Sequence, residues 1–229
     1  MANYLIVGGS SGIGRALVDL LLQDGHQVHV WARESRDLPA TVSFTAYDVT
    51  GEEDPPKDQL PDALDGLVYC PGSIDLKSFR SLKAPAFREA FDLNVVGAVR
   101  CLQAAERAMK KSGAASVVLF STVAVQRGMP FHAAVAAAKG GVEGLTRSLA
   151  AEYAPVIRVN AIAPSLTDTP LASKLLSTEE KRQASAERHP LKRVASPDEI
   201  AAMAAFLLSD RAAFVTGQIM GMDGGLGAI

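Results

Sequence analysis

The sequence predicts an α/β fold of three layers, in which a doubly wound parallel sheet of about seven strands lies between helices. Three observations predict it. Short apolar runs rich in β-branched residues alternate with longer helical patterns, as in parallel sheets whose strands are joined by helices. A glycine-rich turn joins the first strand directly to the first helix. The 229 residues contain no linker, repeat or low-complexity tract, so a single domain over 1–229 is expected.

The expected elements follow one another along the chain in a regular order. Seven apolar runs predict strands at 4–7, 27–31, 42–47, 66–70, 116–120, 158–162 and 218–222. Four longer segments with helical patterns predict helices at 12–23, 85–111, 132–153 and 197–208. One connection departs from this order, because Pro55, Pro56 and Pro61 leave too few helix-forming residues between the third and fourth strands. The stretch 51–61 is therefore predicted as a surface loop.

Composition and charge exclude several classes of function. The formal net charge is −2, from 23 basic and 25 acidic residues, so no binding to nucleic acid or to an anionic membrane is expected. Cys70 and Cys101 are too few for a disulfide framework and fit a reducing compartment. No cysteine or histidine cluster predicts a metal site. The apolar run at 4–7 is too short for a signal peptide or a membrane span, so a cytoplasmic protein is expected.

The turn after the first strand predicts a site for a nicotinamide dinucleotide in a Rossmann-type fold. Glycines allow positive φ angles and let the backbone approach a pyrophosphate closely. The following helix offers free N–H groups and the positive end of its dipole. The residues expected to contact the dinucleotide here are Gly8, Ser10, Ser11, Gly12, Ile13 and Gly14. The alternative is a glycine-rich turn that holds no ligand.

The end of the second strand predicts which dinucleotide is bound. An acidic residue at this place would accept a hydrogen bond from the 2′-hydroxyl of NAD, whereas an arginine suits the 2′-phosphate of NADP. The strand runs into Arg33, with no acidic residue before Glu34. A guanidinium at this position can pair with a phosphate and stack on adenine. NADP(H) is therefore favoured over NAD(H), the alternative being a solvated arginine at a strand end.

Further motifs give the chain a resemblance to the short-chain dehydrogenase/reductase family over nearly its whole length. The glycines of the turn match the glycine motif of that family, and Asp48-Val49 looks like its adenine-contacting pair. Gly72 matches the last residue of the family's Asn-Asn-Ala-Gly motif. The stretch Asn160 to Ser165 resembles its Asn-x-x-x-Pro-Gly motif. The resemblance implies that three further residues lie toward the nicotinamide, namely Pro164, Thr167 and Thr169.

The resemblance also implies an active site, with one departure. Asn94 matches the family's active-site asparagine, and Thr122 stands at its catalytic serine. Lys139 matches the lysine of the Tyr-x-x-x-Lys signature, which binds the nicotinamide ribose. Counting back four residues from Lys139, or forward thirteen from Thr122, gives Val135 in place of the tyrosine. Valine can neither donate nor accept a proton, so the proton that a reduced carbonyl needs must come from elsewhere.

Two sources of that proton stay open. His132 lies three residues before Val135 and seven before Lys139, so on a helix it would share their face. It could titrate near neutral pH, or it could only cap the helix start. The other source is a water molecule held by Lys139 and Thr122 in the space that the phenol would fill.

Two functions therefore remain as hypotheses. One is an NADP(H)-dependent oxidoreductase that acts on a small carbonyl or alcohol substrate with altered proton transfer. The other is an inactive or weakly active NADP(H)-binding protein with a regulatory or assembly role, because a fold does not fix a function. The Ala- and Leu-rich helices at 85–111 and 132–153 predict a helix-to-helix dimer contact, and the resemblance implies tetramers formed through equivalent helices, so a homo-oligomer, a dimer or tetramer, is expected. The polar segment 166–194 falls where the family's substrate lid lies, and Ser177-Thr178-Glu179-Glu180 resembles a helix start.

Overall fold

The computed structural model describes residues 1–229 and contains one sheet of seven strands in the order β3-β2-β1-β4-β5-β6-β7. Every pair of neighbouring strands is parallel. The strands are β1 (Asn3–Val7), β2 (Gln27–Ala32), β3 (Ser43–Ala46), β4 (Gly66–Tyr69), β5 (Ala115–Phe120), β6 (Ile157–Pro164) and β7 (Ile219–Met222). The predicted doubly wound parallel sheet is confirmed, and each strand boundary lies within two residues of its predicted position.

The strands are nearly continuous apolar runs because both faces of the sheet are covered. Successive side chains of a strand point to opposite faces. In β1, Leu5 and Val7 belong to one core cluster, whereas Tyr4 and Ile6 belong to the other. The sheet therefore separates two hydrophobic cores, and each needs its own layer of helices.

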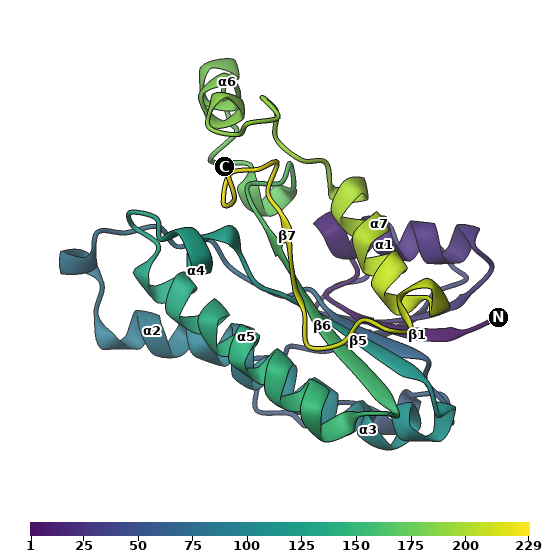
Figure 1. Cartoon of the computed structure of the whole chain (residues 1–229). Helices are drawn as coiled ribbons and strands as arrows, with labels where there is room; N and C mark the ends of the chain where they lie inside the picture. Colours follow the sequence, from purple (N-terminus) through teal and green to yellow (C-terminus); the bar gives the residue numbers. More distant parts are fainter.

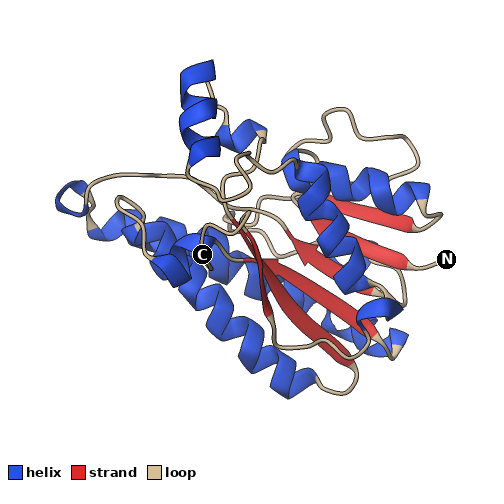
Figure 2. Cartoon of the chain, turned by 45° about the horizontal axis from the view of Figure 1, so that its top comes forward, coloured by secondary structure: helices blue, strands red, loops and turns tan.

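Helices cover both faces of the sheet, as Figures 1 and 2 show. Helices α1 (Gly12–Gln23) and α7 (Pro197–Leu208) pack together on the core that contains Ile6. Helices α3 (Gly97–Ser112) and α5 (Ala133–Tyr153) cover the other core. No helix combines the length and the apolar character needed to cross a membrane.

Two segments outside these layers agree with their predictions. Between β3 and β4 the chain forms a loop with a single 3₁₀ turn, Lys57–Gln59, in place of a crossover helix. In the polar segment after β6, helix α6 (Glu179–Glu187) begins at Thr178, whose hydroxyl accepts a hydrogen bond from the N–H of Lys181 at 3.3 Å. Figure 1 shows α6 standing away from the sheet, above its carboxyl end.

The prediction of one continuous helix over 85–111 is wrong. Helix α2 (Ala84–Phe91), which packs against α5, is followed by a π-helical turn at Asp92–Val96, and only then by α3. Within the turn the N–H of Gly97 bonds to the carbonyl of Asp92, five residues back. The side chain of Asn94 donates instead to the carbonyl of Ala90 at 2.7 Å. Turns of this kind are frequent at functional sites, and this one carries a residue of the predicted active site.

Candidate functional site

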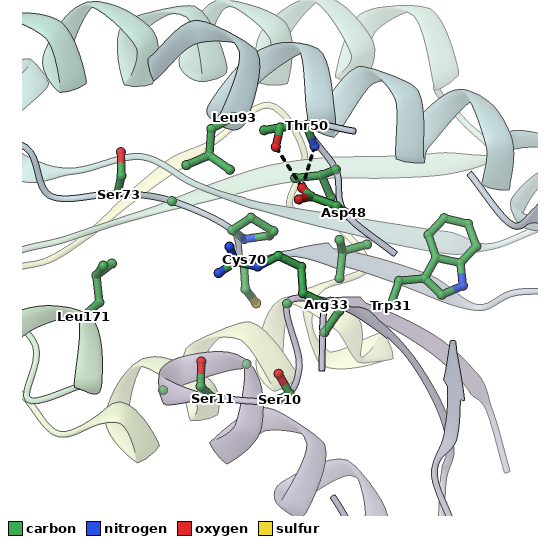
Figure 3. A pocket seen from close by; sticks show the side chains of 18 of the residues that line it. Ser10, Ser11, Trp31, Arg33, Asp48, Thr50, Cys70, Ser73, Leu93 and Leu171 are labelled. Atoms are coloured by element: carbon green, nitrogen blue, oxygen red, sulfur yellow. Dashed lines mark hydrogen bonds between the residues drawn. The ribbon is translucent and has the colours of Figure 1, made fainter. Parts of the chain in front are cut away.

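A cavity of about 1230 Å³ opens at the carboxyl ends of the strands, where β1 lies between β2 and β4. The strand order reverses at this point, and open α/β sheets bind ligands there. The wall of the cavity includes most of the predicted cofactor residues, namely Gly8, Ser10, Ser11, Gly12, Ile13, Gly14, Arg33, Asp48, Val49, Gly72 and Thr169. Figure 3 shows Ser10 and Ser11 across the cavity from Asp48 and Thr50. Lys139, Pro164 and Thr167 lie outside this wall.

The glycine turn has the shape that a pyrophosphate requires. Gly8 and Gly12 have φ angles of 77° and 54°, which side chains disfavour. A Cβ atom on Gly14 would lie 2.4 Å from the carbonyl oxygen of Gly8, so only glycine permits this packing. The side chain of Ser11, the N-cap residue of α1, makes no capping hydrogen bond. The first N–H groups of α1 therefore have no side-chain acceptor and can bind phosphate oxygens.

Across the cavity from Ser10 and Ser11, the acidic Asp48 lies near Arg33, a basic residue that forms no ion pair. Asp48 accepts hydrogen bonds from the N–H of Thr50 at 3.0 Å and from its hydroxyl at 2.8 Å, as drawn in Figure 3. These bonds, together with the charge of Arg33, hold the pKa of the Asp48 carboxyl below its usual range. Arg33 lines the cavity, and none of the ion pairs of the protein includes it. Its guanidinium is thus available to a phosphate group.

Sequence reasoning missed a further arginine at this end. The guanidinium of Arg100, on α3, donates hydrogen bonds to the carbonyls of Val49 at 3.2 Å, Gly51 at 2.6 Å, and Glu53. It also lies over the ring of Tyr47, 6.0 Å from its centroid. Arg100 therefore fastens the loop that follows Asp48. The contacts join residues about fifty positions apart, and no local pattern signals such a pairing.

Substituting Arg100 by glutamine is expected to weaken dinucleotide binding about tenfold. The loop at 49–53 would lose charge-assisted hydrogen bonds, each of which contributes about 1.5–3 kcal/mol, and the end of the cavity beside Asp48 would become less ordered. Trp31 is the only tryptophan and lines the cavity, so its fluorescence can follow the titration. Arg107→Gln, at an exposed position of the same helix, is the control. Equal dissociation constants for the two variants would contradict the assigned role.

Two buried polar side chains approach Gly72, a residue of the cavity wall. A Cβ atom on Gly72 would lie 3.5 Å from Oδ1 of Asn94 and 3.6 Å from Nζ of Lys139. Asn94 has no exposed surface, and its Oδ1 has no hydrogen-bond partner in the protein. Lys139 donates to the carbonyl of Phe120 at 2.7 Å and keeps further donor capacity. An unpaired acceptor and an ammonium donor thus lie close to one common position beside Gly72, where both can contact the same polar ligand or reactant.

Burial changes the proton affinity of two groups at this place. It lowers the pKa of Lys139 to about 8, because a charge is costly away from water. It raises the pKa of the Cys70 thiol to about 12, so Cys70 is a protonated and weak nucleophile at neutral pH. No group of three or more His, Cys, Asp or Glu side chains is placed to hold a metal ion. The titratable group of interest near Gly72 is therefore Lys139.

The structure separates Val135 from His132. Val135 lies on α5, one helical turn before Lys139, and lines the cavity. His132 precedes the helix, with its Nδ1 2.7 Å from the carbonyl oxygen of Pro130, and is not part of the cavity wall. Thr122 caps the short helix α4 (Val123–Arg127) by accepting a hydrogen bond from the N–H of Ala124 at 3.3 Å. Its hydroxyl hydrogen stays available to another acceptor.

The chain after β6 crosses from the sheet to the glycine turn. Pro164 ends β6, and the buried Thr167 donates from its hydroxyl to the carbonyl of Ser165 at 3.3 Å. Thr169 reaches the cavity, where its Cβ lies 3.4 Å from the position that a Cβ on Gly12 would take. The segment thus connects the strand end to the N-terminus of α1 over the cavity.

Known proteins are similar to this chain in sequence and in architecture. The family model described as enoyl-(acyl carrier protein) reductase matches residues 7–227. The chain is 35% identical to cis-4-hydroxycyclohexanecarboxylate dehydrogenase of Sinomonas cyclohexanicum, over 98% of this chain and 96% of the relative. A short-chain dehydrogenase family protein from Francisella tularensis superposes with a TM-score of 0.88 at 29% identity, covering 100% of both chains.

A third comparison concerns a protein whose structure contains a dinucleotide. A variant of ElxO in which phenylalanine replaces a tyrosine, with NADPH bound, has a TM-score of 0.87 and 26% identity over 99% of both chains. The glycine turn, the parallel sheet and these matches agree over the whole length of the chain. The chain belongs to the short-chain dehydrogenase/reductase family, whose members are oxidoreductases that act on alcohols and ketones with a nicotinamide cofactor.

Proposed function

We propose that the protein is an NADP(H)-dependent oxidoreductase that interconverts a small carbonyl compound and its alcohol, with water in place of tyrosine as the proton carrier. The observation that carries this proposal is that Asn94 Oδ1 and Lys139 Nζ both lie close to Gly72 in the cavity wall, with Lys139 one helical turn from Val135. A contact with the ribose would explain the buried ammonium of Lys139, but it leaves the unpaired Oδ1 of Asn94 without a role, and a buried acceptor is costly unless a polar reactant or water binds it.

We assign a part of the cofactor to each group of residues in and around the cavity. The glycine turn and the first N–H groups of α1 bind the pyrophosphate, Asp48 and Val49 flank the adenine, and Arg33 binds the 2′-phosphate. Lys139 holds the nicotinamide ribose, and the segment with Pro164, Thr167 and Thr169 lies toward the carboxamide. When bound, the nicotinamide supplies or accepts the hydride at the substrate carbon.

Residues near Val135 then polarise the substrate carbonyl and supply its proton. The free hydroxyl hydrogen of Thr122 polarises the carbonyl oxygen, and negative charge grows on that oxygen during reduction. A water held by Asn94 Oδ1 and the Lys139 ammonium protonates it, and Lys139 replenishes the water. His132 is the weaker candidate, because its ring nitrogen is engaged with the carbonyl of Pro130 outside the cavity wall.

Substituting Arg33 by alanine is expected to raise the dissociation constant of NADPH about 10- to 100-fold and to change that of NADH less than about twofold. Charge-assisted hydrogen bonds to a phosphate contribute about 1.5–3 kcal/mol, and NADH has no 2′-phosphate to lose them. Trp31 fluorescence reports both titrations, and Arg107→Ala controls for the change in net charge. Equal weakening of both dinucleotides would reject the assignment of Arg33.

Turnover assays test the proposed activity itself. A panel of ketones, aldehydes and alcohols, each with NADPH or NADP⁺, is expected to contain compounds that are slowly converted. The second candidate, a non-catalytic NADP(H)-binding protein, is favoured by Val135. Tight binding of NADPH with no turnover over the whole panel would support that candidate and reject the oxidoreductase.

The proposal extends to a cytoplasmic homo-oligomer. Both cysteines are free thiols, which suits a reducing compartment. Helix α5 carries many alanines and glycines, a composition that lets a helix from a second copy approach closely. Sedimentation is expected to give a dimer or tetramer.

A further inference from the structure

A tyrosine in the core contacts the π-helical turn that carries Asn94. Tyr69 is the last residue of β4 and is 2% exposed. Its hydroxyl donates a hydrogen bond of 2.6 Å to the carbonyl of Leu93, the residue before Asn94. Burial raises the pKa of this phenol, so it stays protonated and a donor at neutral pH.

The carbonyl of Leu93 needs this donor because of the turn. In an α-helix it would accept from the N–H of Gly97, four residues ahead. That N–H bonds to the carbonyl of Asp92 instead, so the hydroxyl of Tyr69 takes the place of the lost partner. A Cβ atom on Gly97 would lie 2.4 Å from the hydroxyl oxygen, so glycine at this position is what lets the phenol reach the carbonyl.

The direction of the Asn94 side chain depends on the same turn. Its Nδ2 donates to Ala90 two positions before the turn begins, which leaves Oδ1 directed at Gly72 beside Lys139. Asn94 directly follows the carbonyl that the hydroxyl of Tyr69 holds, so the direction of Oδ1 depends on the path of the backbone through the turn.

We propose that Tyr69 is a positioning residue, whose hydroxyl holds the π register and thereby aims Oδ1 of Asn94 at the site beside Gly72. The Asn-Asn-Ala-Gly motif of the family has asparagine at the position of Tyr69. The proposed role is therefore inferred from the contacts of Tyr69 in this chain and not from the resemblance. The inference rests on the proposed function only where it concerns catalysis. The orientation of Asn94 can be measured without any turnover.

Tyr69→Phe removes one oxygen and keeps the ring. The chain has three asparagines, Asn3, Asn94 and Asn160, so selective ¹⁵N-asparagine labelling gives three side-chain amide pairs. The pair that disappears in Asn94→Ala belongs to Asn94. We expect Tyr69→Phe to shift this pair and leave that of Asn160 in place. The control is Tyr4→Phe, which removes the hydroxyl of a buried tyrosine in the opposite core and should move neither.

Kinetic measurements provide a second test of the positioning role. Tyr69→Phe is expected to lower kcat about 10- to 100-fold, the effect of a small misplacement in an active site, with KM for NADPH changed less than about twofold. In an Asn94→Ala background the same substitution should lower kcat no further, because both changes act through one group. A merely structural role would give additive losses.

The two proposals fail in different ways. An Asn94 amide pair that stays in place in Tyr69→Phe overturns the positioning role, whatever the activity. A shifted pair in a protein that turns nothing over confirms the positioning and rejects the oxidoreductase. Gly97→Ala provides a further check, since its methyl group would overlap the phenol oxygen and should also shift the pair. The double variant Tyr69→Phe/Gly97→Ala removes the overlap and should fold, with the pair still shifted.

Discussion

Substituting Val135 by tyrosine is expected to raise kcat for carbonyl reduction about 10²- to 10⁴-fold, which is the usual contribution of a positioned general acid. Val135 lines the cavity and lies one turn before Lys139 on the same face of α5. A phenol there would point into the cavity, and the adjacent ammonium would lower its pKa. Hydride transfer would then be coupled to direct protonation instead of depending on water.

A matched variant separates the proton from the bulk of the ring. Val135→Phe adds an aromatic ring of the same size with no hydroxyl, so it is expected to give no increase and to hinder the water route. NADPH affinity, followed by Trp31 fluorescence, should stay within about threefold in both variants if the ring fits the cavity. Equal kcat values for Val135→Tyr and Val135→Phe would show that Thr122 and Lys139 do not form the site that the proposal requires.

The fold could be predicted because its signals are local. Each strand of a sheet covered on both faces is a short apolar run, and each connection shows as a helical pattern or, at Pro55 and Pro56, as its interruption. The glycine turn was predicted for the same reason. The backbone has positive φ angles at Gly8 and Gly12, and such angles favour glycine. The glycines in the sequence therefore indicate the turn directly.

The parts that could not be predicted depend on contacts between distant segments. The π-helical turn interrupts a segment whose residue pattern is that of one helix, and it is stabilised by Tyr69, 24 positions before Leu93. Arg100 likewise donates hydrogen bonds to backbone carbonyls about fifty residues away. Every residue has such a carbonyl, so the residue types in the sequence do not indicate these contacts. The sequence motifs indicated Asn94 and Lys139, but only the structure shows that their polar atoms both lie close to Gly72.

Lys139 is expected to make both the rate and the stability of the protein depend on pH around 8. If its ammonium replenishes the proton-carrying water, kcat for reduction falls as pH rises through about 8, toward tenfold per pH unit. Lys139→Met should abolish turnover. The exposed Lys57→Met is the control and should keep the profile of the unsubstituted protein. A rate that stays constant from pH 7 to pH 10 would exclude Lys139 as the proton source.

The stability prediction has the opposite sign and needs no substrate. An unfolded lysine has a pKa near 10.4, so between about pH 8 and pH 10.4 the unfolded chain binds more protons at this residue than the folded one. The free energy of unfolding therefore gains a contribution as pH rises through this window, about 3 kcal/mol in all. It is fully present above the window and lost as pH falls through 8. Denaturant titrations should show this rise for the unsubstituted protein and for Lys57→Met, and a flatter curve for Lys139→Met. Parallel curves would mean that Lys139 is not held away from water, and the low pKa on which the proposed proton supply depends would then be wrong.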